Sequence, residues 1–240
     1  MSSDDPTALG TWLNTHGYRT PDTALPIIAA YVSEHKYFIA FRLHSVSGVP
    51  SFLVSPVAFS YPGETPCVPI RLTRIATVPS LPILTYVVSD RRAIPTNFVQ
   101  TSVANADVAR LGPSRFFGSS TAYDTLVTQA VTESGGHAWI TEFAGPMPDV
   151  VRASFSPYLQ TLLPATPYVT RMYTTLNTDG MDRDPEFAFV HGLPDVSNVH
   201  DLSAYTTTMH LADLRFLLGA STLVGSFRAL RRRFLRRRAR

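Results

Sequence analysis

The amino-acid sequence predicts an α+β fold, with a mostly antiparallel sheet and three or four packed helices. Apolar residues recur at the helical spacing of about 3.6 up to residue 34, and at the strand spacing of two from residue 37. Turns rich in Pro and Gly separate several strand-like runs at short intervals, which favours antiparallel neighbours. We expect one α+β domain over residues 1–202, followed by a linker and a basic amphipathic tail over residues 203–240.

The first two elements are expected to be helices. Asp5 is a suitable N-cap, Pro6 suits the first turn, and Gly17 is a suitable stop for the first helix. The second helix is expected over residues 22–34, where Pro26 is tolerated because it falls in the opening turn.

Strands are expected next, because side-chain character alternates. The runs that show this pattern are residues 37–43, 52–61, 68–75, 83–88 and 98–103. Their order and short connections favour an antiparallel meander. Pro82 removes a ladder donor, so we expect its strand to lie at an edge or to begin there.

The second half of the domain contains segments with the helical period and segments with the strand period. A polar loop is expected at residues 105–120 and a helix at residues 123–133, ended by the pair Gly135-Gly136. A strand at residues 137–143, a helical stretch at 149–163 and an alternating strand at 168–176 follow.

Composition limits the class of protein. Hydrophobic residues make up 45% of the 240, and 14 Phe, 10 Tyr and 2 Trp exclude a disordered body. Cys67 is the single cysteine, so neither an intrachain disulfide nor a cysteine-based metal site can form. No signal peptide is visible at the amino terminus. The longest apolar run, residues 216–227, falls short of the roughly twenty residues that span a bilayer.

The tail has the pattern of a helix that lies on a membrane surface. Residues 228–240 contain eight of the 21 Lys and Arg side chains, which leaves thirteen basic against eighteen acidic residues in the rest. Apolar residues spaced by four and three form one stripe flanked by arginines. The predicted membrane-tethering residues are Phe216, Leu223, Phe227, Arg231, Arg232, Arg233, Phe234, Arg236, Arg237 and Arg238.

An anionic membrane surface is therefore the expected partner of the tail. Nucleic acid is the weaker alternative, because Phe234 is the one aromatic residue interleaved with the arginines. A disordered, solubilising end is the other interpretation.

An acidic loop is the strongest candidate for a metal site. Asp179, Asp182, Asp184 and Glu186 alternate along a turn that contains Gly180. Oxygen ligands of this kind suit calcium, although their spacing differs from that of an EF-hand loop. The alternative is a solvated turn, and no other cofactor is expected.

Glu142 is the second candidate, because it shares a face with Ala138 and Ile140 on the expected strand. A buried carboxylate there needs either a raised pKa, as in some general acids, or a cationic partner such as Arg171. The sequence lacks the Gly-x-Ser-x-Gly, Ser-x-x-Lys and His-Glu-x-x-His motifs, so no catalytic residue is assigned.

A group of arginines precedes these candidates. Arg71, Arg74, Arg91 and Arg92 fall at neighbouring strand ends, where they could clamp a carboxylate or phosphate. Solvated edge charges, partly neutralised by Asp90, are the interpretation that we favour.

Several runs, in order, resemble the bacterial family called domain of unknown function 2330 (DUF2330), in its carboxy-terminal half only. They extend from about Ala8 to Phe187. The matching pieces are Trp12-Leu13, Gly17-Tyr18, Pro21, Tyr37-Phe38-Ile39-Ala40, Pro69-Ile70-Arg71-Leu72-Thr73, Arg92, Pro95, Asn97, Gly135-Gly136, Thr141-Glu142-Phe143, Thr170-Arg171-Met172-Tyr173, Met181, Asp184-Pro185 and Phe187.

The resemblance implies an exported or surface-anchored bacterial protein without an assigned reaction, and it suggests a cell-envelope location. It also implies that an amino-terminal β-rich half is missing, which a separate chain could supply. We therefore expect a non-enzymatic, envelope-associated binding or structural domain, held peripherally at the membrane by its tail. The alternative is a carboxylate-dependent or cation-dependent enzyme with a site around Glu142 and the loop 179–186.

Overall fold

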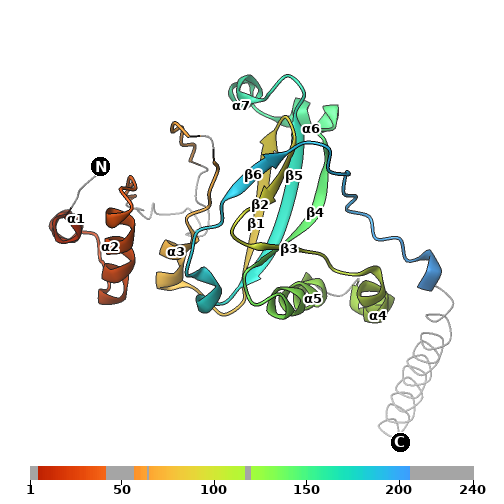
Figure 1. Ribbon diagram of the computed structural model, residues 1–240, viewed down its shortest axis with the longest axis horizontal. Helices are drawn as coiled ribbons and strands as arrows, with labels where there is room; N and C mark the ends of the chain where they lie inside the picture. Colours follow the sequence, from red (N-terminus) through yellow and green to blue (C-terminus); the bar gives the residue numbers. More distant parts are fainter. Residues whose placement is uncertain (1–4, 42–56, 64, 117–119, 206–240) are drawn as a thin grey trace, which may run out of the picture.

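The computed structural model describes residues 5–41, 57–63, 65–116 and 120–205, and it confirms the α+β class (Figure 1). The central sheet has the strand order β1-β5-β4-β3. Its strands are β1 (Leu81–Ser89), β5 (Tyr168–Leu176), β4 (Ala138–Pro146) and β3 (Val99–Thr101). Neighbours pair antiparallel except β3, which runs parallel to β4. A second antiparallel sheet joins β2 (Arg92–Pro95) to β6 (Phe187–Val190).

The inner face of the central sheet carries the main core. Met172 on β5 is fully buried, and Thr170 accepts a 2.9 Å hydrogen bond from the Ala93 backbone N–H on β2. Trp139 on β4 meets Phe187 on β6 edge to face, with ring centroids 5.8 Å apart. The small sheet therefore covers this face, and burial of these large side chains supplies much of the hydrophobic stabilisation.

The outer face is covered by helices along part of its length. Helix α5 (Ser120–Glu133) bonds to β5 through the hydroxyls of Thr128 and Thr175, 2.8 Å apart, and α4 (Asn105–Phe116) packs beside α5 (Figure 1). Further along the same face, Leu84 and Tyr86 on β1 are exposed. The outer face is therefore covered by α5 at one end and exposed to solvent at the other. We call the boundary between these two parts the step.

The amino-terminal helices form a smaller core to one side of the sheet (Figure 1). The helices are α1 (Pro6–Thr15) and α2 (Leu25–Ser33), joined by the 3₁₀ turn η1 (Asp22–Ala24). Leu9, Ile28 and Val32 are buried there, and Leu72 and Ile75 pack against them from α3 (Ile70–Thr73) and η2 (Arg74–Ala76).

Several predicted elements are confirmed. Asp5 caps α1 by accepting the Thr7 backbone N–H at 2.8 Å. Helix α5 ends before Gly135 and Gly136, whose φ values of +82° and +81° favour glycine. Strand β5 occupies residues 168–176 as predicted, and β1, which contains Pro82, lies at the sheet edge. The helical stretch consists of α6 (Asp149–Ser154) and α7 (Pro157–Leu162).

The strand predicted at residues 68–75 is wrong, because the segment forms α3 and η2. Ile70 is buried in the main core, whereas Leu72 and Ile75 pack against the amino-terminal core. A short helix between two cores needs apolar residues on both sides. Apolar residues therefore alternate with polar ones along this segment, which is the pattern expected of a strand.

Residues 37–41 and 57–61 are not strands either, although Phe41 and Phe59 rings lie 5.5 Å apart. Tyr37 and Ile39 are exposed, so alternation in this segment does not report a buried face. Residues 42–56 lie outside the described residues. The meander is also wrong, because β1 pairs with the distant β5 rather than with a strand next to it in sequence.

The polar loop predicted at residues 105–120 is mostly helix α4. In the part of α4 whose side chains the structure describes, residues 105–111, Val108 is buried in the main core. Its neighbours are mostly small or polar, which is why the sequence predicted a loop. The chain is described up to the 3₁₀ turn η4 (Ser203–Tyr205), and the predicted tethering residues of the tail lie outside the described residues. Within the described ranges, no helix has the length and apolar character needed to cross a membrane.

Candidate functional site

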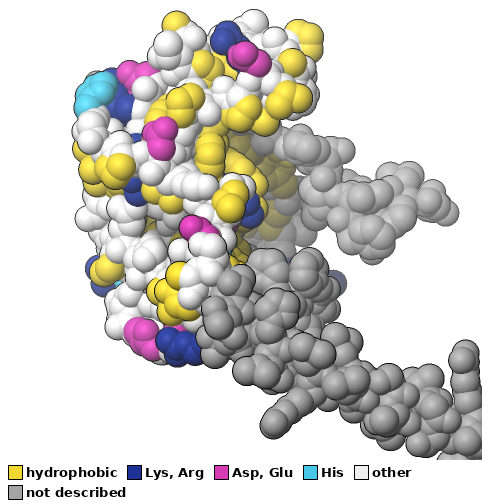
Figure 2. All heavy atoms as spheres, turned by 90° about the vertical axis from the view of Figure 1, so that its right-hand side faces the viewer, with side chains coloured by type: hydrophobic (Ala, Val, Ile, Leu, Met, Phe, Trp, Pro, Cys, Tyr) yellow, Lys and Arg dark blue, Asp and Glu magenta, His cyan; other side chains and the backbone are white. Residues whose placement is uncertain are grey.

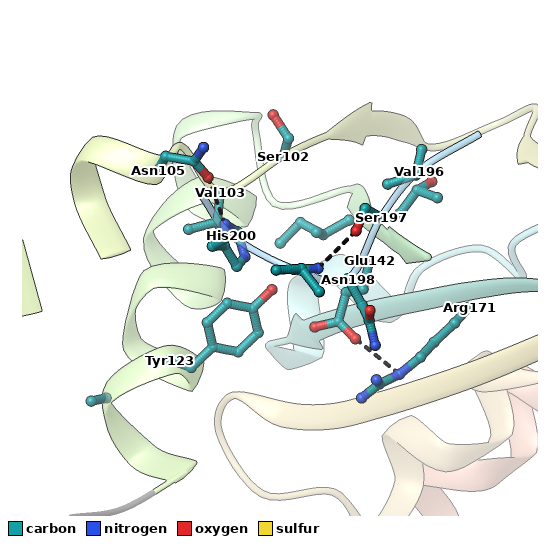
Figure 3. Close-up of a pocket in the computed structure, with 14 residues that line it drawn as sticks. Ser102, Val103, Asn105, Tyr123, Glu142, Arg171, Val196, Ser197, Asn198 and His200 are labelled. Atoms are coloured by element: carbon teal, nitrogen blue, oxygen red, sulfur yellow. Dashed lines mark hydrogen bonds and ion pairs between the residues drawn. The ribbon is translucent and has the colours of Figure 1, made fainter. Parts of the chain in front are cut away.

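A cavity of about 440 Å³ lies at the step on the outer face of the central sheet. Its walls come from β4, β5, the beginnings of α4 and α5, and the segment 196–200 (Figure 3). Cavities of this size, with apolar walls and a few polar groups, are typical of small-molecule sites.

A β-bulge places the most deeply buried charged group of this cavity. The register between β4 and β5 shifts between Thr141 and Phe143, so Glu142 is the extra residue. Bulges redirect a side chain and often occur beside functional sites. Here Glu142 lies with Arg171, and its side chain is 9% exposed.

The Glu142–Arg171 pair confirms the ion pair expected from the sequence. Glu142 Oε2 lies 3.1 Å from Arg171 Nε (Figure 3). The contact is close but not aligned, since neither atom makes a hydrogen bond within the described part of the chain. A buried charge with incomplete hydrogen bonding carries a desolvation cost that a suitable ligand would offset.

Tyr123 forms the opposite wall, and its hydroxyl points toward Glu142 (Figure 3). Burial, followed by the negative charge of Glu142, raises the pKa of Tyr123. A tyrosine hydroxyl is already protonated at neutral pH, so it is a hydrogen-bond donor here with or without this shift. Its ring stacks on Tyr173 with centroids 6.4 Å apart, which fixes its orientation.

The segment 196–200 closes the remaining side. Val196 exchanges two backbone hydrogen bonds with Ala144, of 2.9 and 2.7 Å. At the other end, His200 Nδ1 lies 2.8 Å from Asn105 Oδ1 at the beginning of α4. The segment is thus held at both ends, and it brings Ser197 and the amide of Asn198 to the cavity.

The predicted metal ligands do not converge. Asp182 Oδ1 lies 2.7 Å from His137 Nε2 and 3.1 Å from Arg183 Nε. Hydrogen bonding to Arg183 and His137 lowers the pKa of Asp182 to about 2. Asp184 instead accepts the Tyr31 hydroxyl at 2.6 Å.

The other two acids have separate surroundings. Asp179 lines a smaller cavity of about 270 Å³, and the exposed Glu186 bonds through its backbone N–H to Asn97 Oδ1 at 3.0 Å. Across the described residues, no group of three or more His, Cys, Asp or Glu side chains is placed to share a metal ion. Glu142 and the loop 179–186 thus lie in different places rather than in one site.

The arginines at 71 and 92 are not solvated edge charges. The Arg71 side chain is 15% exposed, contacts Glu34 at 2.6 Å and Asp184 at 3.3 Å, and lies over the Tyr31 ring at 4.0 Å. Arg92 is buried on β2. The Arg91–Asp90 pair does match the expected partly exposed edge pair.

Sequence reasoning found Glu142 and Arg171 but missed the rest of the cavity. The other polar lining residues come from segments that become neighbours only through the order of strands in the sheet. They are Tyr123, Asn105, Asn198 and His200. No local motif joins them, because residues 105 and 123 lie far along the chain from residues 198 and 200.

Comparison with known protein families identifies the family to which the chain is similar. A family model described as an uncharacterized protein conserved in bacteria (DUF2330) matches residues 1–188. The match covers residues 1–188, so the family predicted from the sequence is confirmed. The narrower expectation, that the chain resembles only the carboxy-terminal half of the family, is slightly inaccurate. Neither a curated protein nor a solved structure matches the chain.

Proposed function

The chain belongs to the uncharacterized bacterial family DUF2330, and from its cavity we propose that it is a non-enzymatic binding domain associated with the cell envelope. The observation that carries the binding role is the Glu142–Arg171 pair inside the 440 Å³ cavity. Both side chains are held by adjacent strands, so the site is formed before any ligand arrives. Such preorganisation lowers the entropic cost of binding.

Binding is favoured over catalysis by what surrounds Glu142. Its carboxylate faces a guanidinium at 3.1 Å, an arrangement more typical of binding and structural sites than of a proton donor. The alternative of an enzyme that uses Glu142 with the loop 179–186 needs the two to meet. Glu142 lines the larger cavity, whereas Asp179 lines the smaller one.

Thermal unfolding of the full chain with a panel of small-molecule classes tests the binding role. The panel contains amino acids, amines, carboxylic acids, sugars and nucleotides. A ligand at 100 times its Kd should stabilise the fold by about 2.7 kcal/mol, which raises the Tm by roughly 5–10 °C. The shift should shrink in Glu142→Gln and persist in the surface variant Asp90→Asn. No shift with any class would contradict the binding role.

The envelope association rests on the tail. Eight arginines within residues 228–240 give a dense positive charge next to an apolar stripe. On the face drawn in Figure 2, hydrophobic side chains gather in the middle, and basic and acidic side chains lie close to one another. The described surface in that view thus mixes charges of both signs, whereas residues 228–240 of the tail contain arginines and no acid.

Cosedimentation with vesicles tests this association. The full chain should sediment with vesicles that contain phosphatidylserine, and deletion of residues 216–240 should abolish sedimentation. Replacing Arg231, Arg232 and Arg233 by Gln should weaken partitioning roughly a hundredfold, at about 1 kcal/mol for each charge. A matched change of the exposed Arg110, Arg152 and Arg183 should leave partitioning nearly unchanged. Sedimentation that survives the deletion would contradict the tether.

A further inference from the structure

The cavity presents one charge of each sign, side by side. Among the described residues that line it, Glu142 is the acidic residue and Arg171 is the arginine, and His200 lies at the far end by Asn105. The remaining polar lining consists of amides and hydroxyls, including Tyr123 and Asn198 (Figure 3). The site is therefore close to neutral overall but strongly dipolar.

The two charges only partly satisfy each other. Glu142 Oε2 and Arg171 Nε are buried and 3.1 Å apart, yet neither makes an aligned hydrogen bond within the described chain. The Glu142 side chain is about nine-tenths buried, whereas Arg171 is about one-third exposed. The guanidinium has further N–H groups beyond Nε, so it retains donors for a ligand.

A ligand with a single charge fits this pair poorly. A cation bound to Glu142 would lie beside the guanidinium, and an anion bound to Arg171 would lie beside the carboxylate. In either case, part of the attraction would be cancelled by repulsion from the neighbouring charge. A ligand with both charges, about as far apart as the two side chains, gains from both.

We infer that the cavity binds a small zwitterion of the α-amino acid class, with its ammonium group on the Glu142 carboxylate and its carboxylate group on the Arg171 guanidinium. This inference rests on the proposed binding function and names the ligand class of the same site. The Tyr123 hydroxyl points toward Glu142 and adds a polar group at this end of the cavity. Val103, Val196 and Val199 provide an apolar wall for an aliphatic side chain.

Calorimetric titration of the full chain with three matched compounds tests the inference. L-leucine carries both charges, 3-methylbutylamine lacks the carboxylate, and 4-methylpentanoate lacks the ammonium group. L-leucine should bind at least tenfold more tightly than either analogue. The amine is repelled by Arg171 without a carboxylate to offset this repulsion, and the acid is repelled by Glu142 without an ammonium group to offset it. Sorbitol, an uncharged polyol, should not bind.

Variants identify the site. Glu142→Gln removes one charge with almost no change of shape, and it should weaken L-leucine binding at least tenfold. Arg171→Lys keeps the charge without the planar fork and should weaken binding less than Arg171→Met. Asp90→Asn removes a partly exposed carboxylate from a surface pair and should bind like the unmodified protein. Circular dichroism confirms that each variant is folded.

Other results would overturn the inference. Equal binding of the amine and L-leucine would show a cation site, equal binding of the acid would show an anion site, and binding of sorbitol alone would show a polyol site. Each of these results leaves the binding function intact. No heat from any compound, together with no thermal shift across the wider panel, would overturn both.

Discussion

At the scale of single residues, the functional assignment depends on Glu142. The sequence predicted both its strand and its partner Arg171, because a carboxylate on an apolar face needs a cation. The sequence could not predict the bulge at residues 141–143, since a register shift is a property of two paired strands. Nor could it predict Tyr123, whose hydroxyl reaches the cavity from a helix.

The stability of the fold in acid should depend on Asp182. Its pKa of about 2 in the folded chain lies below the ordinary 3.8, first through hydrogen bonding to Arg183. Asp182 therefore contributes stability above about pH 4, and this contribution is lost as the pH falls toward 2. Asp182→Asn should flatten the decrease of the free energy of unfolding between pH 5 and pH 2, as measured in urea.

Arg183→Met should flatten the same acid-induced decrease, because it removes the largest cause of the low pKa. The side chain of Asp182 is 42% exposed, so salt should weaken the effect. A decrease as steep in Asp182→Asn as in the unmodified protein would show that other groups control acid stability.

The stability of the contact between the main core and the amino-terminal core should depend on Arg71. Arg71→Met removes contacts to Glu34 and Asp184, whose side chain is 11% exposed, and leaves that carboxylate with fewer donors. We expect a loss of about 2–3 kcal/mol in the free energy of unfolding, below the loss for a fully buried pair. Denaturant unfolding measures it.

The matched control for this prediction is Arg91→Met, because the Arg91–Asp90 pair is more exposed. It should leave the free energy of unfolding nearly unchanged. If both variants lose the same stability, Arg71 does not join the cores as described.

At the scale of elements, prediction succeeded for two helices with one buried stripe and for a nine-residue strand in the middle of the sheet. Strand β5 and helices α1 and α5 follow the expected periods. Prediction failed for α3, which contacts two cores, and for α4, in whose described part, residues 105–111, Val108 is the buried residue. Periodicity separates helix from strand poorly in a segment as short as the four residues of α3, and in a helix such as α4, whose described part has little burial.

The turn after β5 should tolerate no side chain at Gly180. An added Cβ would lie 2.6 Å from the carbonyl oxygen of Gly136, which is backbone and cannot move aside. Gly180→Ala should therefore destabilise the fold by about 1–3 kcal/mol. Thermal and denaturant unfolding both measure this change.

Gly10→Ala is the matched control for the turn. Its Cβ would meet Leu25 at an ordinary 3.6 Å, and alanine favours the helix interior of α1 by up to about 1 kcal/mol. It should be neutral or stabilising. A Gly180→Ala variant as stable as Gly10→Ala would show that the two backbones are not in close contact.

At the scale of the whole molecule, sheet order decides where chemistry can occur. Strands β1 and β5 pair across about ninety residues of sequence, and β3 lies parallel to β4 at the far edge. This topology brings α4, α5 and the segment 196–200 around one part of the outer face. The sequence predicted the elements but not their neighbours, because pairing between distant strands leaves no local signal.

Hydrogen–deuterium exchange of the full chain, with and without L-leucine, tests the central claim most directly. Bound ligand should slow exchange in β4 around Glu142 and in the segment 196–200, which together surround the cavity. Glu142→Gln should remove that protection. Protection confined to the loop 179–186, or protection that persists in Glu142→Gln, would contradict a binding site built on the Glu142–Arg171 pair.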